Sequence, residues 1–135
     1  GILYPVHLNP RVREVVFQRL GSHRQIQLIE PCGYREFVWL MNHCRFILSD
    51  SGGVQEEAPS LGKPVLVLRD TTERPEGVEA GTCSLVGTNP DRILSAAKEL
   101  LVNDAELQRR SRLANPYGDG TAAQQIVSIL EGDLS

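Results

Sequence analysis

Residues 46–68 read FILSDSGGVQEEAPSLGKPVLVL, a segment with two apolar runs on either side of a helical pattern. Phe46–Leu48 predicts a strand that ends in the turn-forming segment Ser49–Gly53. A helix is expected over about Val54–Leu61, because a glycine of the kind that ends helices comes next. Pro64–Leu68 is apolar almost throughout, which is typical of a strand buried on both faces of a parallel sheet. The segment therefore predicts a β-α-β unit.

The same alternation continues on both sides of this unit. Apolar runs predict further strands at Ile2–Val6, Ile26–Ile29 and Ser84–Val86. Helical patterns cover residues 11–20, 37–44, 90–101, 105–113 and 121–130. Asn9 and Asn89 each precede a proline, as an N-cap residue often does. Such alternation implies right-handed crossovers with helices on both faces of a sheet. We therefore expect an α/β fold with a doubly wound parallel sheet, a Rossmann-like domain that occupies residues 1–135.

Composition narrows the possible partners. The 135 residues carry a net charge of -3 with both signs interspersed, so no nucleic acid partner is expected. The apolar runs are much shorter than the ~20 residues of a bilayer span, so no membrane is expected. No charged-then-apolar leader opens the sequence, so export is not expected either. Cys32, Cys44 and Cys83 are odd in number and widely spaced, which favours reduced thiols in a cytoplasmic protein.

The sequence motifs do not indicate a bound cofactor. Neither Gly-x-Gly-x-x-Gly nor the P-loop pattern occurs, which disfavours dinucleotide cofactors and P-loop nucleotide hydrolysis. No cysteine or histidine cluster has the spacing of a metal site, so no metal is expected.

The strongest candidate for a ligand site is the segment Ser49–Gly53. It follows a predicted strand, and ligands of open parallel sheets bind at the carboxyl ends of strands. Two glycines would let backbone N–H groups approach a phosphate, and Ser51 would add a hydroxyl. An ordinary strand-to-helix turn with a serine or aspartate N-cap would have the same sequence, and the two interpretations are about equally supported.

Charged residues near this segment could complete such a site. Glu56 and Glu57 point about 100° apart on a helix, so one is expected to accept sugar hydroxyls and the other to face solvent. Arg74 lies in the charged segment Arg69–Glu76 after the most apolar strand, where its guanidinium could bind a diphosphate. Either Phe37 or Trp39 could stack on a base, although core packing is the ordinary role of both.

Several segments resemble the non-hydrolysing UDP-N-acetylglucosamine 2-epimerases. The resemblance covers nearly the whole chain and is carried by Tyr4–Pro10, Asp50–Ala58, Gly62–Pro64, Arg69–Glu76 and Asn115–Gly120. It implies a glycosyltransferase-B-like architecture of two Rossmann-like domains, of which this chain is similar to the C-terminal one. The implied reaction interconverts UDP-N-acetylglucosamine and UDP-N-acetylmannosamine by anti elimination of UDP and re-addition. It also implies a homodimer, a product used for bacterial surface polysaccharides, and little or no activity for residues 1–135 alone.

The resemblance also assigns roles to individual residues. It implies that UDP contacts Phe37 through the uracil, Ser51, Gly52, Gly53 and Arg74 through the diphosphate, and Glu57 through the ribose. His7 lies in a segment that contributes to an activating second UDP-N-acetylglucosamine site in some relatives. No catalytic residue is assigned in this chain, because the proton-handling carboxylates of the family lie mostly in the other domain. Cys32 stands where some relatives carry a glutamine, at a position that the resemblance places beside the uracil. A thiol cannot supply the paired donor and acceptor of an amide, so the resemblance does not extend to direct side-chain recognition of the uracil there.

Three alternatives remain open at this point. A UDP-sugar glycosyltransferase and a hydrolysing epimerase would share the architecture. A non-catalytic nucleotide-binding module would share the fold alone.

Overall fold

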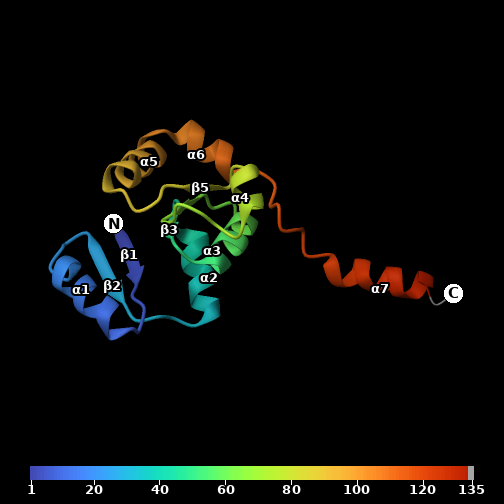
Figure 1. The fold of residues 1–135 in the computed structure, drawn as a ribbon, viewed down its shortest axis with the longest axis horizontal. Coiled ribbons are helices and arrows are strands. Elements are labelled where there is room, and N and C mark those ends of the chain that lie inside the picture. The colour runs from blue at the N-terminus through green and yellow to red at the C-terminus, as the bar shows by residue number, and fades with distance from the viewer. Residues whose placement is uncertain (134–135) are drawn as a thin grey trace. The chain divides into compact units, whose positions relative to one another are not determined.

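The computed structural model describes residues 1–133 (Figure 1). The described elements are β1 (Ile2–Pro5), α1 (Pro10–Leu20), β2 (Ile26–Ile29), α2 (Tyr34–His43), β3 (Ile47–Ser49), α3 (Gly52–Glu57), the 3-10 helix η1 (Ala58–Leu61), β4 (Val65–Val67), α4 (Pro75–Glu79), β5 (Cys83–Leu85), α5 (Pro90–Val102), α6 (Asp104–Ser111) and α7 (Ala122–Asp133). They fall into two compact units, which we call unit 1 (Gly1–Leu40) and unit 2 (Met41–Ser135).

Unit 1 contains a parallel pair of strands joined by a helix. β1 pairs with β2 from Ile2 opposite Ile26 to Pro5 opposite Ile29. Between these strands, α1 begins where the Asn9 side chain accepts a hydrogen bond of 3.0 Å from the backbone N–H of Arg11. The expected asparagine N-cap followed by proline is therefore confirmed at this helix.

Unit 2 contains a three-stranded parallel sheet in the order β3-β4-β5. The central strand β4 is buried at every position, as the apolar run of residues 64–68 predicted. The helices α5 and α6 lie on one side of this sheet and α3 on the other (Figure 1). A core cluster of Leu66, Val86, Leu100 and Leu107 joins the sheet to α5 and α6. At the start of α5, Asn89 accepts hydrogen bonds from two backbone N–H groups, so the second predicted cap is also confirmed.

The predicted α/β class with parallel strands is confirmed, and the hydrogen bonding adds detail. The strands lie in two sheets, β1-β2 in unit 1 and β3-β4-β5 in unit 2. The helix after the glycine turn begins at Gly52, and Pro59 falls in the 3-10 turn that follows. The charged segment Arg69–Glu76 ends in the first residues of the short helix α4, which starts at Pro75.

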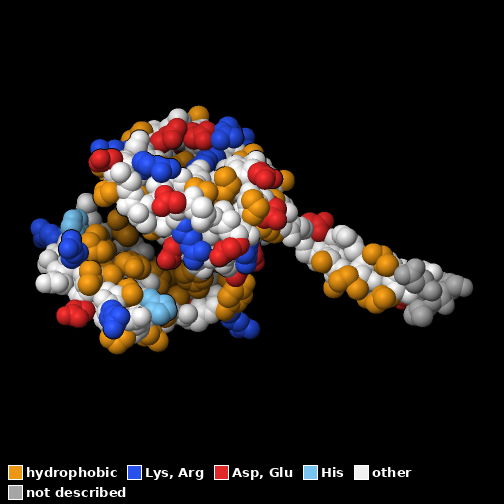
Figure 2. Space-filling model, viewed as in Figure 1, with side chains coloured by type: hydrophobic (Ala, Val, Ile, Leu, Met, Phe, Trp, Pro, Cys, Tyr) orange, Lys and Arg blue, Asp and Glu red, His pale blue; other side chains and the backbone are white. Residues whose placement is uncertain are grey.

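The helix α7 exposes much of its apolar surface. Ile126, Val127, Ile129 and Leu130 are each more than half exposed, and Figure 2 shows hydrophobic side chains along this helix. Among residues 1–133, no helix is long and apolar enough to cross a membrane.

Candidate functional site

The predicted site residues of unit 2 meet where β3 leads into α3. Ser51 takes the N-cap position of α3 with extended backbone angles (φ -78°, ψ 130°). Its backbone N–H donates to Oγ of Ser49 at 3.1 Å, which shapes the turn. The Ser51 side chain makes no capping hydrogen bond to the helix. The Ser51 hydroxyl therefore does not cap the helix, which is the role that it would have in an ordinary strand-to-helix turn.

Arg74 reaches this turn from the segment that follows β4. A methyl group placed on Gly52 would lie 3.7 Å from Nη2 of Arg74, so the guanidinium lies against the first residue of α3. Its Nε donates to Oε1 of Glu56, and Nη1 lies 4.0 Å from Oε2 of Glu73. The hydrogen bond with Glu56 is the main reason that the pKa of Arg74 is raised. A permanent positive charge therefore lies beside the glycine turn.

Glu57 occupies a different environment from Glu56. A methyl group placed on Gly53 would lie 3.9 Å from both Oε1 of Glu57 and Oγ of Ser51, so these two side chains flank the same glycine. Oε2 of Glu57 is buried and has no hydrogen-bond partner among the described residues. A buried acceptor without a donor is costly, and a ligand hydroxyl would remove that cost. The two adjacent glutamates therefore have separate environments, as their helical positions predicted.

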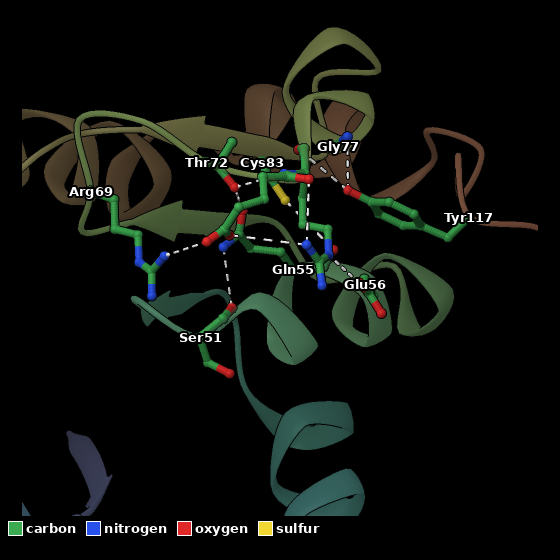
Figure 3. Close-up of polar contacts among 10 residues, drawn as sticks. Ser51, Gln55, Glu56, Arg69, Thr72, Gly77, Cys83 and Tyr117 are labelled. Carbon is green, nitrogen blue, oxygen red and sulfur yellow. Dashed lines mark hydrogen bonds and ion pairs between the residues drawn. The ribbon is translucent and has the colours of Figure 1, made fainter.

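A buried polar network connects the turn to the Arg74 segment (Figure 3). The side chain of Gln55 is fully buried and bonds both the carbonyl of Ser51 and the hydroxyl of Thr72. The hydroxyl of Tyr117 accepts from the backbone N–H of Gly77 at 3.0 Å. No local sequence pattern distinguishes Gln55, Thr72 or Tyr117 from their neighbours. Only the motif match around residues 50–58, 69–76 and 115–120 marked these segments.

Arg69 lies at the opposite end of this cluster from Glu56 (Figure 3). Its Nη1 lies 3.6 Å from Oε1 of Glu73, four residues later. The structure therefore directs Arg69 to a neighbour in its own segment and Arg74 to α3.

Two further predicted site residues belong to unit 1. Phe37 is half-buried in α2, and its backbone N–H donates to the carbonyl of Gly33 at 2.9 Å. His7 is exposed after β1, and its Nδ1 accepts from the backbone N–H of Asn9 at 3.0 Å. This contact gives His7 a structural role at the start of α1. Cys32 is a half-buried free thiol.

Unit 2 also has a concave region, which lies apart from the Ser51–Gly53 turn. Its volume is about 890 Å³, and its lining includes Pro59, Asn115 and Gln125. None of Ser51, Gly52, Gly53, Glu57 and Arg74 lines it. We therefore base the candidate site on the convergence of side chains at the β3–α3 turn.

Comparisons with known proteins agree on one family. The family model for UDP-N-acetylglucosamine 2-epimerase matches residues 1–131. The chain is 58% identical to the UDP-N-acetylglucosamine 2-epimerase of Escherichia coli K12 over 132 residues, which are 98% of this chain and 35% of that protein. It is 56% identical to the enzyme of the same name from Bacillus subtilis, over 96% of this chain and 34% of that protein. The chain thus spans about a third of the length of these curated relatives.

Solved structures agree with this result. The MnaA protein of Staphylococcus aureus was solved with UDP and is similar to this chain, with a TM-score of 0.92 and 51% sequence identity. The match covers 99% of this chain and 37% of the MnaA chain. The UDP-GlcNAc 2-epimerase of Neisseria meningitidis, bound to UDP-GlcNAc, matches 96% of this chain and 36% of its own, with a TM-score of 0.87 and 50% identity. From its sequence and its fold, this chain belongs to the UDP-N-acetylglucosamine 2-epimerase family.

Proposed function

We propose that this chain is the UDP-binding, C-terminal part of a two-domain UDP-N-acetylglucosamine 2-epimerase. The proposed reaction interconverts UDP-N-acetylglucosamine and UDP-N-acetylmannosamine. The proton on carbon 2 is removed and the bond from carbon 1 to the UDP oxygen breaks, which leaves an acetamidoglucal and free UDP. Re-addition of UDP, with a proton delivered to the other face of carbon 2, gives the epimer. The chain spans about 35% of the length of its relatives, so the activity is proposed for the full-length protein.

The observation that carries this proposal is the convergence of three different groups on the Ser51–Gly53 turn. The Arg74 guanidinium lies against Gly52, whereas the Ser51 hydroxyl and the Glu57 carboxylate flank Gly53. A guanidinium and a hydroxyl are donors that suit a diphosphate. Donors fixed beside a departing diphosphate stabilise the charge that develops on it. We therefore assign Ser51, Gly52, Gly53 and Arg74 to the diphosphate.

The ribose is assigned to Glu57 because of its unsatisfied oxygen. Oε2 of Glu57 is buried without a partner among the described residues, and a carboxylate can only accept hydrogen bonds when ionised. Sugar hydroxyls donate hydrogen bonds and so complement this group. Phe37 is proposed to pack on the uracil, on the strength of the family resemblance and its half-buried position in α2.

The remaining assignments rest on the family and on exposed surface. We propose that α7 packs against the part of the full-length protein outside this chain, because its apolar residues from Ile126 to Leu130 are exposed here. A homodimer and a cytoplasmic location are proposed from the resemblance, and the three free cysteines suit a reducing compartment. His7 is proposed for an activating second site, where its Nδ1 would stay bonded to Asn9.

The test is a product assay on the full-length protein with UDP-N-acetylglucosamine in deuterated water. The expected products are an equilibrium mixture with UDP-N-acetylmannosamine and deuterium at carbon 2 of both sugars. Free N-acetylmannosamine with free UDP would indicate a hydrolysing enzyme. Transfer of the sugar to an added acceptor would indicate a glycosyltransferase. Binding of UDP-N-acetylglucosamine without any turnover would indicate a non-catalytic module.

An NMR titration with UDP locates the site in the same protein. Amide shifts are expected at Phe37, at Gly52 and Gly53, at Glu57 and at Arg74. Shifts confined to other parts of the chain would contradict the assignment of these residues. Residues 1–135 alone are expected to show no epimerase activity.

A further inference from the structure

The side chain of Gln55 is fully buried between two segments of the proposed diphosphate site. Its Nε2 donates to the backbone carbonyl of Ser51 at 3.2 Å, and its Oε1 accepts from Oγ1 of Thr72 at 2.8 Å (Figure 3). The same Thr72 oxygen accepts from the backbone N–H of Arg74 at 3.1 Å. One buried amide and one hydroxyl therefore connect the backbone at Ser51 to the backbone at Arg74.

The direction of each hydrogen bond in this chain is determined by its partners. The Ser51 carbonyl can only accept, so it must face the NH₂ end of the Gln55 amide. Oε1 of Gln55 can only accept, so the Thr72 hydroxyl donates its one proton to this oxygen and accepts from the backbone N–H of Arg74 through a lone pair. Exchanging the two ends of the amide would place Oε1 of Gln55 against the carbonyl oxygen of Ser51, which is also an acceptor. The network therefore specifies one arrangement of the two segments.

We infer that Gln55 and Thr72 are positioning residues that set the separation between the Ser51–Gly53 turn and Arg74, and thereby the affinity for a nucleoside diphosphate. This inference rests on the proposed function, since the two segments are the ones assigned to the diphosphate. Neither side chain is proposed to contact the diphosphate, and each instead holds the backbone of a residue that is. Gln55 acts through the backbone of Ser51, and Thr72 acts through the backbone of Arg74.

Burial of the Gln55 amide favours this one arrangement. A polar group that loses its partner inside a protein keeps its full desolvation cost, so movement of either segment is strongly opposed. The backbone of Gln55 is also held from the sheet, because Sγ of Cys83 in β5 donates to its carbonyl at 3.8 Å. Its backbone N–H bonds the Ser51 carbonyl at 3.4 Å, so that carbonyl receives two hydrogen bonds from one residue. A diphosphate that needs donors from both segments would meet them already at a fixed spacing.

The decisive experiment compares Thr72→Val with Thr72→Ser in the full-length protein. Valine has nearly the shape of threonine but leaves Oε1 of Gln55 and the N–H of Arg74 unpaired, whereas serine keeps the hydroxyl. The dissociation constant for UDP is measured by calorimetry at a temperature where circular dichroism shows every variant folded. We expect it to rise about 10-fold in Thr72→Val and to stay within about 2-fold of wild type in Thr72→Ser.

Two further variants separate positioning from general loosening of unit 2. Gln55→Met keeps an unbranched side chain of similar length without the amide, and should also weaken UDP binding about 10-fold. Leu107→Ala removes core volume in α6, away from the network, and should lower the melting temperature while leaving UDP affinity within about 2-fold of wild type. Equal UDP affinity in wild type, Thr72→Val and Thr72→Ser would overturn this inference and leave the proposed function in place. The same holds if Leu107→Ala weakens UDP binding as much as Thr72→Val does. A wild-type protein that binds no UDP would overturn the proposed function together with it.

Discussion

Arg74 donates a hydrogen bond from Nε to Oε1 of Glu56, while the next residue in the sequence, Glu57, stays outside this ion pair. The bond uses Nε, the guanidinium nitrogen nearest the backbone, and Nη2 lies against Gly52. Both partners are partly exposed, with 36% of the Arg74 side chain and 42% of the Glu56 side chain accessible. Glu56 therefore orients a cation at the glycine turn, and solvent limits the energy of the pair itself.

Replacing Glu56 tests whether it orients Arg74 or competes with the ligand for it. Glu56→Ala removes the acceptor that holds Nε, so the UDP dissociation constant should rise about 2- to 5-fold, the range of an exposed ion pair. Glu56→Gln keeps an acceptor oxygen and removes a negative charge near the diphosphate, so its affinity should match wild type or exceed it slightly. Calorimetry on the full-length protein measures both. Tighter UDP binding by Glu56→Ala would show that Glu56 competes with the diphosphate for Arg74.

Arg74 and Arg69 offer a matched pair of cations in one segment. Arg74 lies against Gly52, whereas Nη1 of Arg69 lies 3.6 Å from Glu73 in its own segment. In the full-length protein, Arg74→Ala should lower kcat/KM for the proposed epimerisation by about 100-fold or more, because it removes the donor proposed for the departing diphosphate. Arg69→Ala should change kcat/KM by less than about 3-fold, as expected for a partly exposed ion pair. Equal and mild losses in the two variants would remove Arg74 from the diphosphate site.

The strands, the helix caps and the glycine turn could be predicted because each depends on a local pattern. An apolar run without polar interruption needs burial on both faces, and Val65–Val67 are buried at every position. An asparagine before a proline satisfies the first N–H groups of a helix, and the caps at Asn9 and Asn89 form as expected. These features depend on neighbours a few residues away in the sequence.

The buried network could not be predicted because it depends on tertiary contacts. Gln55, Glu56 and Glu57 are three consecutive polar residues, and no local pattern says which of them faces the interior. The structure buries Gln55 because Thr72, 17 residues later, and the Ser51 carbonyl satisfy both ends of its amide. Tyr117 likewise reaches the backbone of Gly77 from 40 residues away. The division of the strands into two sheets is also set by long-range pairing rather than by any single segment.

The three cysteines should differ in their reaction with a maleimide. Cys83 is 2% exposed, and burial raises the pKa of its thiol, so little of the reactive thiolate forms near neutral pH. Cys32 is half-buried, and we expect it to react at least about 10-fold faster than Cys83. Mass spectrometry of the full-length protein over time measures each rate.

Adding UDP to the same labelling experiment tests the position of Cys32. If Cys32 lies beside the uracil, as the resemblance implies, saturating UDP should slow its labelling. Cys44 serves as the internal control, because it is half-buried in unit 2 and is not assigned to UDP. Unchanged labelling of Cys32 by a protein that binds UDP would place this thiol away from the base.

The ion pair between Arg13 and Glu30 predicts a loss of stability in acid. Nη1 and Nη2 of Arg13 donate to the two carboxylate oxygens of Glu30 at 2.7 and 2.6 Å, and these bonds lower the pKa of Glu30 from its ordinary value of 4.5. Because the folded pKa is the lower one, the pair stabilises the fold above the unfolded pKa. That stabilisation disappears as the pH falls through the folded pKa.

The melting temperature of wild type minus that of Glu30→Gln should therefore be largest near pH 6 and shrink towards about pH 3. Glu30→Gln keeps the cation of Arg13 over the Phe17 ring, so only the carboxylate differs between the two proteins. A difference that stays constant across this range would mean that Arg13 does not hold Glu30 ionised in solution.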